Sequence, residues 1–539
     1  MTGIFFKVRI HSIIFFAALQ FGAFSADADL PPVSPFYDIP YNMYDAYTGW
    51  YYSNSLLVIA EKWWPDYQQY WGVQPYGPRV CGYTLNTFPN GPQNNNFGSV
   101  TLTGQCSGGN VIHGQKVCPG GYTLNGAGTL CTINGEADKE KNYGSPPNCD
   151  GVGNPVHTGT GNKYQEESDV GGQIPVNRYY NSQSKRDHST GFGWSISYSR
   201  KVTVLGNSIR VTRDDGYTEY FNCSSSPCQG GSDTLFRVTE DANGYSITDA
   251  ADTVEQYAPN GLLQLITYVS GITDTPGYDA QNRLDRVDQS TGEYIRFTYD
   301  STGRLETLLA NDETRAWGYR YDAIGNLVYV DNPDSTVRQY HYEDTNSPRW
   351  LTRITDERGN RYATFEYNAN GEATASYHGP QTSTLTDRID GVSITYNGDG
   401  SRTVTNSNGN SSTYTTTTQV GISLTTDITG PGCSSCGTGN TSYSYDPANN
   451  NLLSKTENTI TTEFGNYDAN GNPGFMIEAK GTSEERRTDY TYDPGFFSKL
   501  ATVTEPSVFT GSNKVTSYSY DAYGNRTAET VDGFTPTGI

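Results

Sequence analysis

Residues Tyr299–Leu305 read YDSTGRL, Tyr321–Leu327 read YDAIGNL, and Tyr520–Arg526 read YDAYGNR. These are the clearest copies of a unit that recurs through the second half of the chain. The register of its tyrosines runs through Tyr257, Tyr278, Tyr299, Tyr321, Tyr342, Tyr367, Tyr396, Tyr445, Tyr467, Tyr492 and Tyr520. The first four intervals are 21, 21, 22 and 21 residues, and a fixed period of this length indicates a repeat architecture.

Each unit has the pattern of two strands joined by a turn. Ahead of Tyr299, the residues Ile295 and Phe297 alternate with polar neighbours, and this period of two predicts a strand. The Asp after the tyrosine can accept hydrogen bonds from the backbone ahead of it, and the glycine tolerates a positive φ, so the segment predicts a chain reversal. We therefore expect structural roles for the motif residues Tyr278, Tyr299, Asp300, Gly303, Tyr321, Asp322, Gly325, Tyr467, Asp468, Gly471, Tyr520, Asp521 and Gly524.

One such hairpin cannot hide its aromatic face, because an isolated two-stranded ribbon is marginal in water. Stacked units share the gain from burying each ring, which is about 1.5–3 kcal/mol at most. The fold class that follows is all-β, with tandem hairpins forming a curved sheet or a partial shell whose edges are exposed. The composition agrees, because 59 Gly, 42 Tyr and only 17% charged residues favour turns and strands over helices.

The signature and its spacing resemble the YD repeats of the Rhs (rearrangement hotspot) family, which is related to teneurins and to the B and C components of insecticidal toxin complexes. The resemblance covers residues from about 235 to 539. A second segment is similar to the domain that precedes the repeats in many Rhs proteins, through Asn154–Val156, Thr160–Tyr164, Glu167–Asp169, Arg178–Ser182 and Gly191–Trp194.

The resemblance implies a mechanical function. In the family, the repeats form a hollow β-shell that encloses a C-terminal polypeptide, commonly a toxin, until delivery to a neighbouring cell. This sequence ends at Ile539, shortly after the last unit, without a recognisable core motif or effector domain. We therefore expect either a fragment of a longer product or a truncated relative, with a C-terminal effector polypeptide or a neighbouring repeat protein as its partner.

Composition shifts divide the chain into five segments. Residues 1–25 are a predicted signal peptide, 26–80 are rich in Tyr, Trp and Pro, and 81–149 form a predicted Cys-rich, disulfide-stapled module. Residues 150–235 form the predicted leader domain, and 236–539 carry the repeats, whose signature is degenerate at about 379–432. That stretch is rich in Thr and Ser but still alternates, which favours degenerate strands over a disordered linker.

The N-terminus has the features of an export signal. Lys7 and Arg9 precede an apolar run, and Ala23-Phe24-Ser25 places small residues at the positions that determine cleavage. An uncleaved anchor is the alternative, because the run contains four phenylalanines. The expected location is therefore secreted or cell-surface, with membrane contact only through this segment.

An exported chain reaches an oxidising compartment, so we expect its cysteines to form disulfides. Cys223 and Cys228 could close a turn, and Cys433 and Cys436 a tight loop. The remaining five, an odd number, are Cys81, Cys106, Cys118, Cys131 and Cys149. For the Cys433 motif, a redox pair and a zinc site shared with Cys223 and Cys228 are alternatives, although no helix-forming sequence follows it.

The net charge of the chain and the catalytic motifs that it lacks argue against several classes of function. A net charge of −22 argues against binding nucleic acid or anionic membranes by charge. The sequence contains no phosphate loop, no nucleophile elbow and no HExxH helix, and the six histidines are scattered. We expect no catalytic, cofactor or metal residues and a non-enzymatic scaffold. A surface adhesin that binds glycans or proteins through exposed aromatics is the alternative, and a hydrolase with an unrecognised carboxylate pair is a third.

Overall fold

The structure is a computed structural model that describes residues 139–147, 150–205, 208–311, 314–381, 384, 387–431, 439–507 and 513–533, and the backbone of seven short strands before them. The chain divides into two compact units, Met1–Glu136 and Ala137–Ile539. The predicted signal peptide lies outside the described residues, as do Cys81, Cys106, Cys118, Cys149, Cys433 and Cys436; for Cys131 only the backbone is described.

In the first unit the described backbone consists of short antiparallel strands. Three of them form a sheet in the order β2-β1-β5, and β3-β4 and β6-β7 form two pairs. Their bounds are β1 (Tyr41–Asp45), β2 (Gly49–Ser53), β3 (Tyr83–Thr87), β4 (Gly98–Leu102), β5 (Gly114–Lys116), β6 (Tyr122–Leu124) and β7 (Cys131–Ile133).

The second unit begins with the leader, here residues 139–235. It contains one 3₁₀ turn, two three-stranded sheets in the orders β10-β11-β14 and β15-β16-β17, and the two strand pairs β8-β9 and β12-β13. The elements are η1 (Lys139–Asn142), β8 (Gly151–Val152), β9 (Val156–His157), β10 (Tyr164–Val170), β11 (Val176–Asn181), β12 (Asp187–His188), β13 (Gly191–Phe192), β14 (Trp194–Ile196), β15 (Lys201–Leu205), β16 (Ser208–Thr212) and β17 (Thr218–Asn222). Cys223 and Cys228 form the expected disulfide just after β17.

All later strands belong to one 26-stranded antiparallel sheet in which each strand pairs with its neighbours in sequence. They are β18 (Arg237–Asp241), β19 (Gly244–Thr248), β20 (Val254–Tyr257), β21 (Leu263–Thr267), β22 (Thr273–Tyr278), β23 (Leu284–Gln289), β24 (Tyr294–Tyr299), β25 (Leu305–Ala310), β26 (Ala316–Tyr321), β27 (Leu327–Asp331), β28 (Val337–His341), β29 (Arg353–Thr355), β30 (Arg361–Tyr367), β31 (Ala373–His378), β32 (Ile389–Tyr396), β33 (Arg402–Asn406), β34 (Ser411–Gln419), β35 (Ile422–Thr429), β36 (Thr441–Tyr445), β37 (Leu452–Glu457), β38 (Ile460–Gly465), β39 (Phe475–Glu478), β40 (Arg486–Tyr492), β41 (Leu500–Pro506), β42 (Asn513–Tyr520) and β43 (Arg526–Asp532). The predicted all-β fold of tandem hairpins is confirmed. The sheet is not closed, because β18 and β43 do not pair with each other.

In the units of Tyr278, Tyr299, Tyr321, Tyr467 and Tyr520, the turn after the tyrosine is held by the aspartate side chain. In the unit of Tyr299, Oδ1 of Asp300 accepts hydrogen bonds from the backbone N–H of Thr302 at 2.8 Å and of Arg304 at 3.0 Å, and Gly303 has φ +87°. A β-bulge falls at the tyrosine itself, since the register shifts between Thr298 and Tyr299. Bulges increase local twist, so their repetition at this position accounts for the curl of the sheet.

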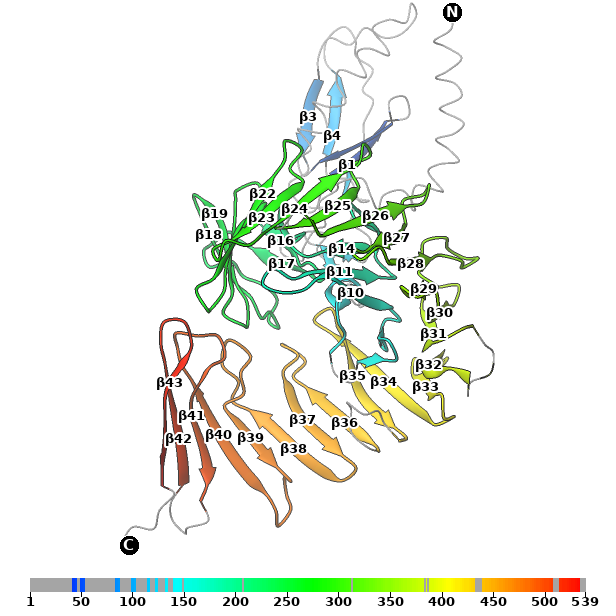
Figure 1. Ribbon diagram of the computed structural model, residues 1–539. Helices are drawn as coiled ribbons and strands as arrows, with labels where there is room; N and C mark the ends of the chain where they lie inside the picture. The colour runs from blue at the N-terminus through cyan, green and yellow to red at the C-terminus, as the bar shows by residue number, and fades with distance from the viewer. Residues whose placement is uncertain are drawn as a thin grey trace, which may run out of the picture. The chain divides into compact units, whose positions relative to one another are not determined.

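The sheet curls far enough for its last turns to meet its first ones. Arg237 of β18 donates to Oδ1 of Asn470 at 2.8 Å, and the backbone N–H of Phe497 donates to Oδ1 of Asp252 at 2.5 Å. The ring of Tyr523 lies against Gly271. The residues that meet are 233, 245 and 252 positions apart, and this length of sheet is called one wrap. In Figure 1 the orange and red strands lie below β18 to β23.

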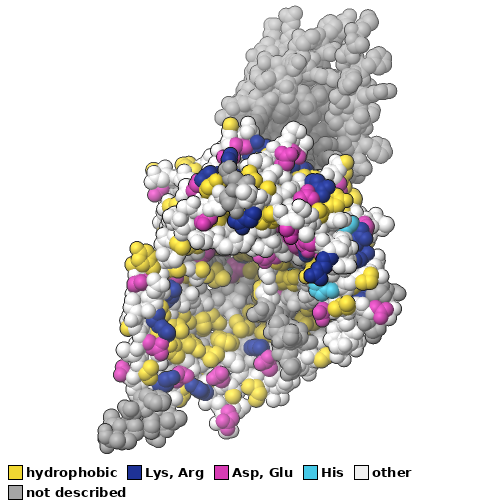
Figure 2. All heavy atoms as spheres, viewed as in Figure 1, with side chains coloured by type: hydrophobic (Ala, Val, Ile, Leu, Met, Phe, Trp, Pro, Cys, Tyr) yellow, Lys and Arg dark blue, Asp and Glu magenta, His cyan; other side chains and the backbone are white. Residues whose placement is uncertain are grey.

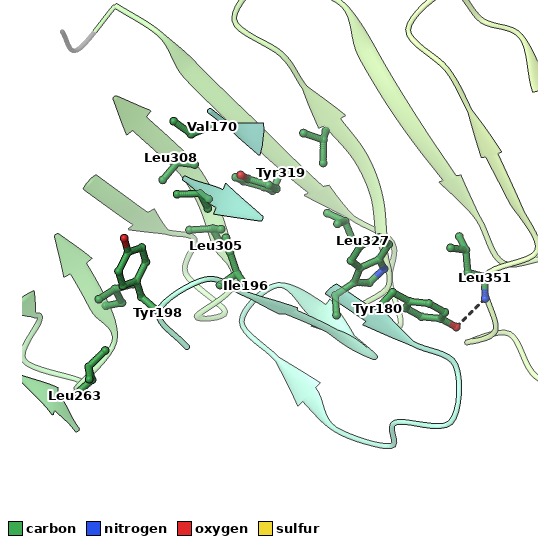
Figure 3. Packing of buried hydrophobic residues seen from close by; sticks show 14 of the residues in the cluster. Val170, Tyr180, Ile196, Tyr198, Leu263, Leu305, Leu308, Tyr319, Leu327 and Leu351 are labelled. Atoms are coloured by element: carbon green, nitrogen blue, oxygen red, sulfur yellow. Dashed lines mark hydrogen bonds between the residues drawn. The ribbon is translucent and has the colours of Figure 1, made fainter. Parts of the chain in front are cut away.

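The leader lies against one face of the first wrap, and the core forms between them. Figure 3 shows Tyr180 and Ile196 of the leader beneath Leu305 and Leu327 of the sheet. This buried cluster extends along the chain from Val152 to Ile428. The leader is therefore internal to the curl of the sheet.

Candidate functional site: the inner face of the sheet

The motif tyrosines use their hydroxyls to tie one repeat to the previous one. Tyr299 donates to the carbonyl oxygen of Leu284 at 2.8 Å, and Tyr321 donates to that of Leu305 at 2.9 Å. The same bond is made by Tyr278 to Leu263, Tyr342 to Leu327, Tyr367 to Leu351, Tyr396 to Ala373, Tyr445 to Thr425, Tyr467 to Leu452, Tyr492 to Pro473 and Tyr520 to Leu500. Each tyrosine thus contributes a hydrogen bond between repeats as well as the apolar area of its ring.

Replacing Tyr299 by Phe is expected to destabilise the second unit by about 0.5–1.5 kcal/mol, because the ring stays while one intramolecular hydrogen bond is lost. Urea denaturation of the whole chain measures the change. Tyr523→Phe is the matched control, since Tyr523 is 54% exposed and makes no such bond to a preceding repeat. Equal stability of the two variants would show that the hydroxyl link contributes nothing.

A buried ion pair lies where the leader meets the sheet. Arg178 of β11 donates from Nε and Nη2 to the carboxylate of Asp169 at 2.7 and 2.9 Å, and both side chains are almost fully buried. From the sheet, Tyr319 donates to Asp169 at 2.7 Å, and Tyr340 accepts from Arg178 at 3.0 Å. Burial alone would lower the pKa of Arg178, but Asp169 beside it holds that pKa well above its usual value.

An aromatic group surrounds this pair. Trp194 of β14 is fully buried, with its ring 5.3 Å from that of Tyr180 and 5.0 Å from that of Tyr340. Its indole N–H donates to the hydroxyl of Tyr342 at 2.9 Å. The hydroxyl of Tyr180 accepts from the backbone N–H of Leu351 at 2.9 Å, as the dashed line in Figure 3 shows. The leader and the inner face therefore share one polar and aromatic core.

The leader also binds strands near the end of the first wrap. Lys141 pairs with Asp233 at 2.7 Å and donates to the carbonyl oxygen of Val420 at 3.0 Å. Asn450, after β36, donates to Asp233 at 2.9 Å. Beside this cluster Glu219 is buried, and Tyr217 donates to it at 3.2 Å. Burial is the main cause that raises the pKa of Glu219 to about 7, with a further contribution from Asp233 that Lys141 opposes.

This raised pKa predicts a pH-dependent stability. The ordinary value is 4.5, so between about pH 4.5 and 7 the folded state binds more protons than the unfolded one, and stability falls as pH rises through that window. Glu219→Gln removes this loss. The variant should exceed the natural protein by about 1–3 kcal/mol at pH 8 and match it near pH 4. Denaturation at both pH values tests this, with the exposed Glu306→Gln as control; a gain that did not depend on pH would contradict it.

Beyond the leader the same face of the sheet is only half-buried. Strand pairing places Phe464 opposite Met476, and Tyr490 opposite Val503, on the face that carries the buried Thr441 and Thr488. The half-buried apolar residues of this open inner face are Tyr443, Phe464, Met476, Tyr490, Val503 and Tyr518. Figure 2 shows hydrophobic side chains gathered in the hollow over these last strands. The open inner face is the candidate functional surface.

The predicted motif residues all lie at the turn side of the hairpins, where they bond backbone groups. Gly325, Gly471 and Gly524 have positive φ like Gly303. Asp322, Asp468 and Asp521 accept backbone hydrogen bonds as Asp300 does. In the unit of Tyr278 the positive φ belongs to Asn282, which the glycine pattern missed.

Tyr257 follows the register, but its hydroxyl donates to Glu255 at 2.6 Å instead of to a preceding repeat. Cys223 and Cys228 lie near Glu240, but their sulfurs bond each other, so this pair supplies no thiolates for the zinc site considered as an alternative. No helix among the described residues has the length and apolar character to cross a membrane.

Two segments of the chain match models of known protein families. Residues 264–393 match the family model described as Teneurin YD-shell, and residues 153–221 match a domain of unknown function, DUF6531. These matches confirm the resemblance to the YD-repeat proteins of the Rhs and teneurin group. No curated protein matches the sequence significantly.

Among solved structures, the chain is similar to a crystal structure of TcdB2-TccC3-Cdc42, with 12% identity and a TM-score of 0.33 over 69% of this chain and 27% of that one. It is also similar to TcdB2-TccC3 without its hypervariable C-terminal region, with 13% identity and a TM-score of 0.32 over 70% and 27%. For the Photorhabdus luminescens Tc holotoxin pore, the identity is 13% and the TM-score 0.31 over 88% and 27%. The chain thus spans about 27% of the length of each of these structures.

Proposed function

We propose that this chain is an exported, non-enzymatic YD-repeat scaffold that forms part of a shell wall. The wall encloses or presents a C-terminal effector polypeptide in contact-dependent competition between cells. The observation that carries this proposal is the open inner face, where Tyr443, Phe464, Met476, Tyr490, Val503 and Tyr518 continue a surface that the leader covers in the first wrap. An unfolded polypeptide exposes apolar side chains that such a surface can contact.

The first test is the gene sequence beyond codon 539. A continuation into further repeats, a core motif and an effector supports the proposal. In that full-length product, the effector segment should resist an added protease while it remains inside the wall. A stop codon directly after Ile539, together with normal secretion of the short chain, would contradict the shell function.

A charged substitution on the open inner face of the same full-length product tests directly whether this face holds the effector. Phe464→Asp should make the effector segment cleavable, because a carboxylate on an apolar contact surface weakens the contact. Phe475→Asp is the matched control, since Phe475 neighbours Met476 on its strand and therefore lies on the opposite face. If both variants protect the effector equally, the inner face does not hold it.

The second candidate function is a surface adhesin. Two tyrosines, Tyr362 and Tyr523, are 39% and 54% exposed, and exposed aromatic rings favour binding to glycans and proteins. Glycan-array binding by the purified chain that is lost in the double variant Tyr362→Ala and Tyr523→Ala would favour this function over the shell.

A further inference from the structure

A small cavity of about 50 Å³ lies in the leader, away from the inner face of the sheet. It is formed by the segment that leads into β12 and by the ends of β15 and β16, where Lys201 pairs with Thr212 across the hairpin. The volume counts the space open to the centre of a water-sized sphere, and one water molecule needs about 10–15 Å³ of such space, so the cavity has room for a group of about four heavy atoms. A phosphate is of this size.

The residues that line the cavity are cations and hydroxyls. Arg186, Lys201 and Arg213 supply three positive charges, and the buried Ser184 and Thr212 supply hydroxyl groups. Among the described residues that form its wall, none is Asp or Glu. The chain as a whole has a net charge of −22, so a wall that holds three cations and no carboxylate differs from the rest of the protein.

Acidic residues outside the wall hold the two guanidinium groups in place. Glu140 accepts from Nε and Nη2 of Arg186, which leaves Nη1 of that arginine for a ligand. Glu255 accepts from Nη1 and Nη2 of Arg213, which leaves its Nε. Each arginine is therefore oriented from behind and keeps a donor, the arrangement that suits an oxyanion.

The cations also act on the histidine in the same wall. Burial is the main cause that lowers the pKa of His188 to about 4; Arg186 and Lys201 contribute in the same direction, and Asp187 opposes them. The imidazole is thus neutral at pH 7 and offers one N–H donor rather than another charge. The cation, hydroxyl and imidazole donors together match the acceptors of a tetrahedral oxyanion.

We propose that this cavity is a binding site for one phosphate-sized oxyanion, held by Arg186, Lys201 and Arg213. The shared chemistry is a phosphoryl group, which can come from free inorganic phosphate or from the end of a phosphomonoester. Binding to the folded state alone raises stability, so thermal unfolding of the whole chain detects it.

The experiment compares sodium phosphate with sodium chloride at equal ionic strength and pH 7. Phosphate should raise the unfolding midpoint in a saturable manner, and Lys201→Gln should weaken the apparent affinity at least tenfold. Lys201 is exposed, so the variant is expected to fold. Lys185→Gln is the matched control, because Lys185 is exposed, lies one residue from Arg186 and does not line the cavity.

Glycerol phosphate distinguishes the two sources. A shift with both compounds assigns the site to a phosphomonoester end, and a shift with inorganic phosphate alone assigns it to the free anion. The absence of any shift beyond that of chloride would overturn the proposal. Equal weakening by Lys185→Gln and Lys201→Gln would also overturn it, since the effect would then follow net charge and not the cavity.

Discussion

Replacing Arg178 by Met is expected to destabilise the second unit by about 3–5 kcal/mol, as is usual when one partner of a buried ion pair is removed. The side chains of Arg178 and Asp169 are only 1% and 3% exposed, so water cannot solvate the carboxylate that remains. The hydroxyl of Tyr319 still donates to Asp169, but a neutral donor does not replace a bidentate guanidinium. Urea denaturation of the whole chain, followed by tryptophan fluorescence, measures the loss.

The double variant Arg178→Met with Asp169→Asn is the control for this prediction. It removes both charges, so it should be more stable than the sum of the two single losses implies. If the two changes were simply additive, Arg178 and Asp169 would not interact, and the ion pair would not be what joins the leader to Tyr319 and Tyr340. A loss below about 1 kcal/mol in Arg178→Met would contradict the prediction directly.

The sequence predicts the hairpins because their determinants are local. The period of two ahead of Tyr299 and the Asp-x-x-Gly turn after it lie within ten residues, and strand pairing between sequence neighbours needs no further information. Asn282 shows the limit of this reasoning. Asparagine also adopts the left-handed conformation at modest cost, so a search for glycine alone passes over its turn.

The bond from each motif tyrosine to the previous repeat was not predicted, although a signal for it existed. Its acceptor is a leucine carbonyl in seven of the ten cases, and five of these leucines, including Leu284 and Leu305, lie two residues after a glycine or asparagine with positive φ. A backbone acceptor does not depend on the side chain, however. The sequence therefore could not show which carbonyl oxygen of the previous repeat accepts the bond from the tyrosine.

The place of the leader inside the sheet could not be predicted from the sequence. Arg178 and Trp194 stand out only as parts of the leader motif, and their partners Tyr340 and Tyr342 are about 150 residues away. Nothing in the period of the repeats distinguishes the strands that the leader covers from those of the open inner face. This difference arises from the curl of the sheet, which accumulates over many bulges.

Replacing Trp194 by Ala is expected to cost about 3–5 kcal/mol, because a fully buried indole is lost and the rigid sheet around it cannot close the space. The loss has a second part. The indole N–H donates to the hydroxyl of Tyr342, which itself donates to the carbonyl oxygen of Leu327, so the variant also removes a member of a hydrogen-bonded chain. Denaturation measures the total, and limited proteolysis reports whether the leader separates from the sheet.

Two comparisons separate these parts of the Trp194 effect. Trp194→Phe keeps an aromatic ring beside Tyr180 and Tyr340 but removes the N–H, so it should cost clearly less than the alanine variant. Trp350→Ala is the control for tryptophan loss in general, because Trp350 is only half-buried against Tyr367 and lies in the loop between β28 and β29. The leader should become sensitive to protease in Trp194→Ala and stay protected in Trp350→Ala. Equal protection in both would mean that the leader is held by its polar contacts, and that its aromatic core against the inner face is dispensable.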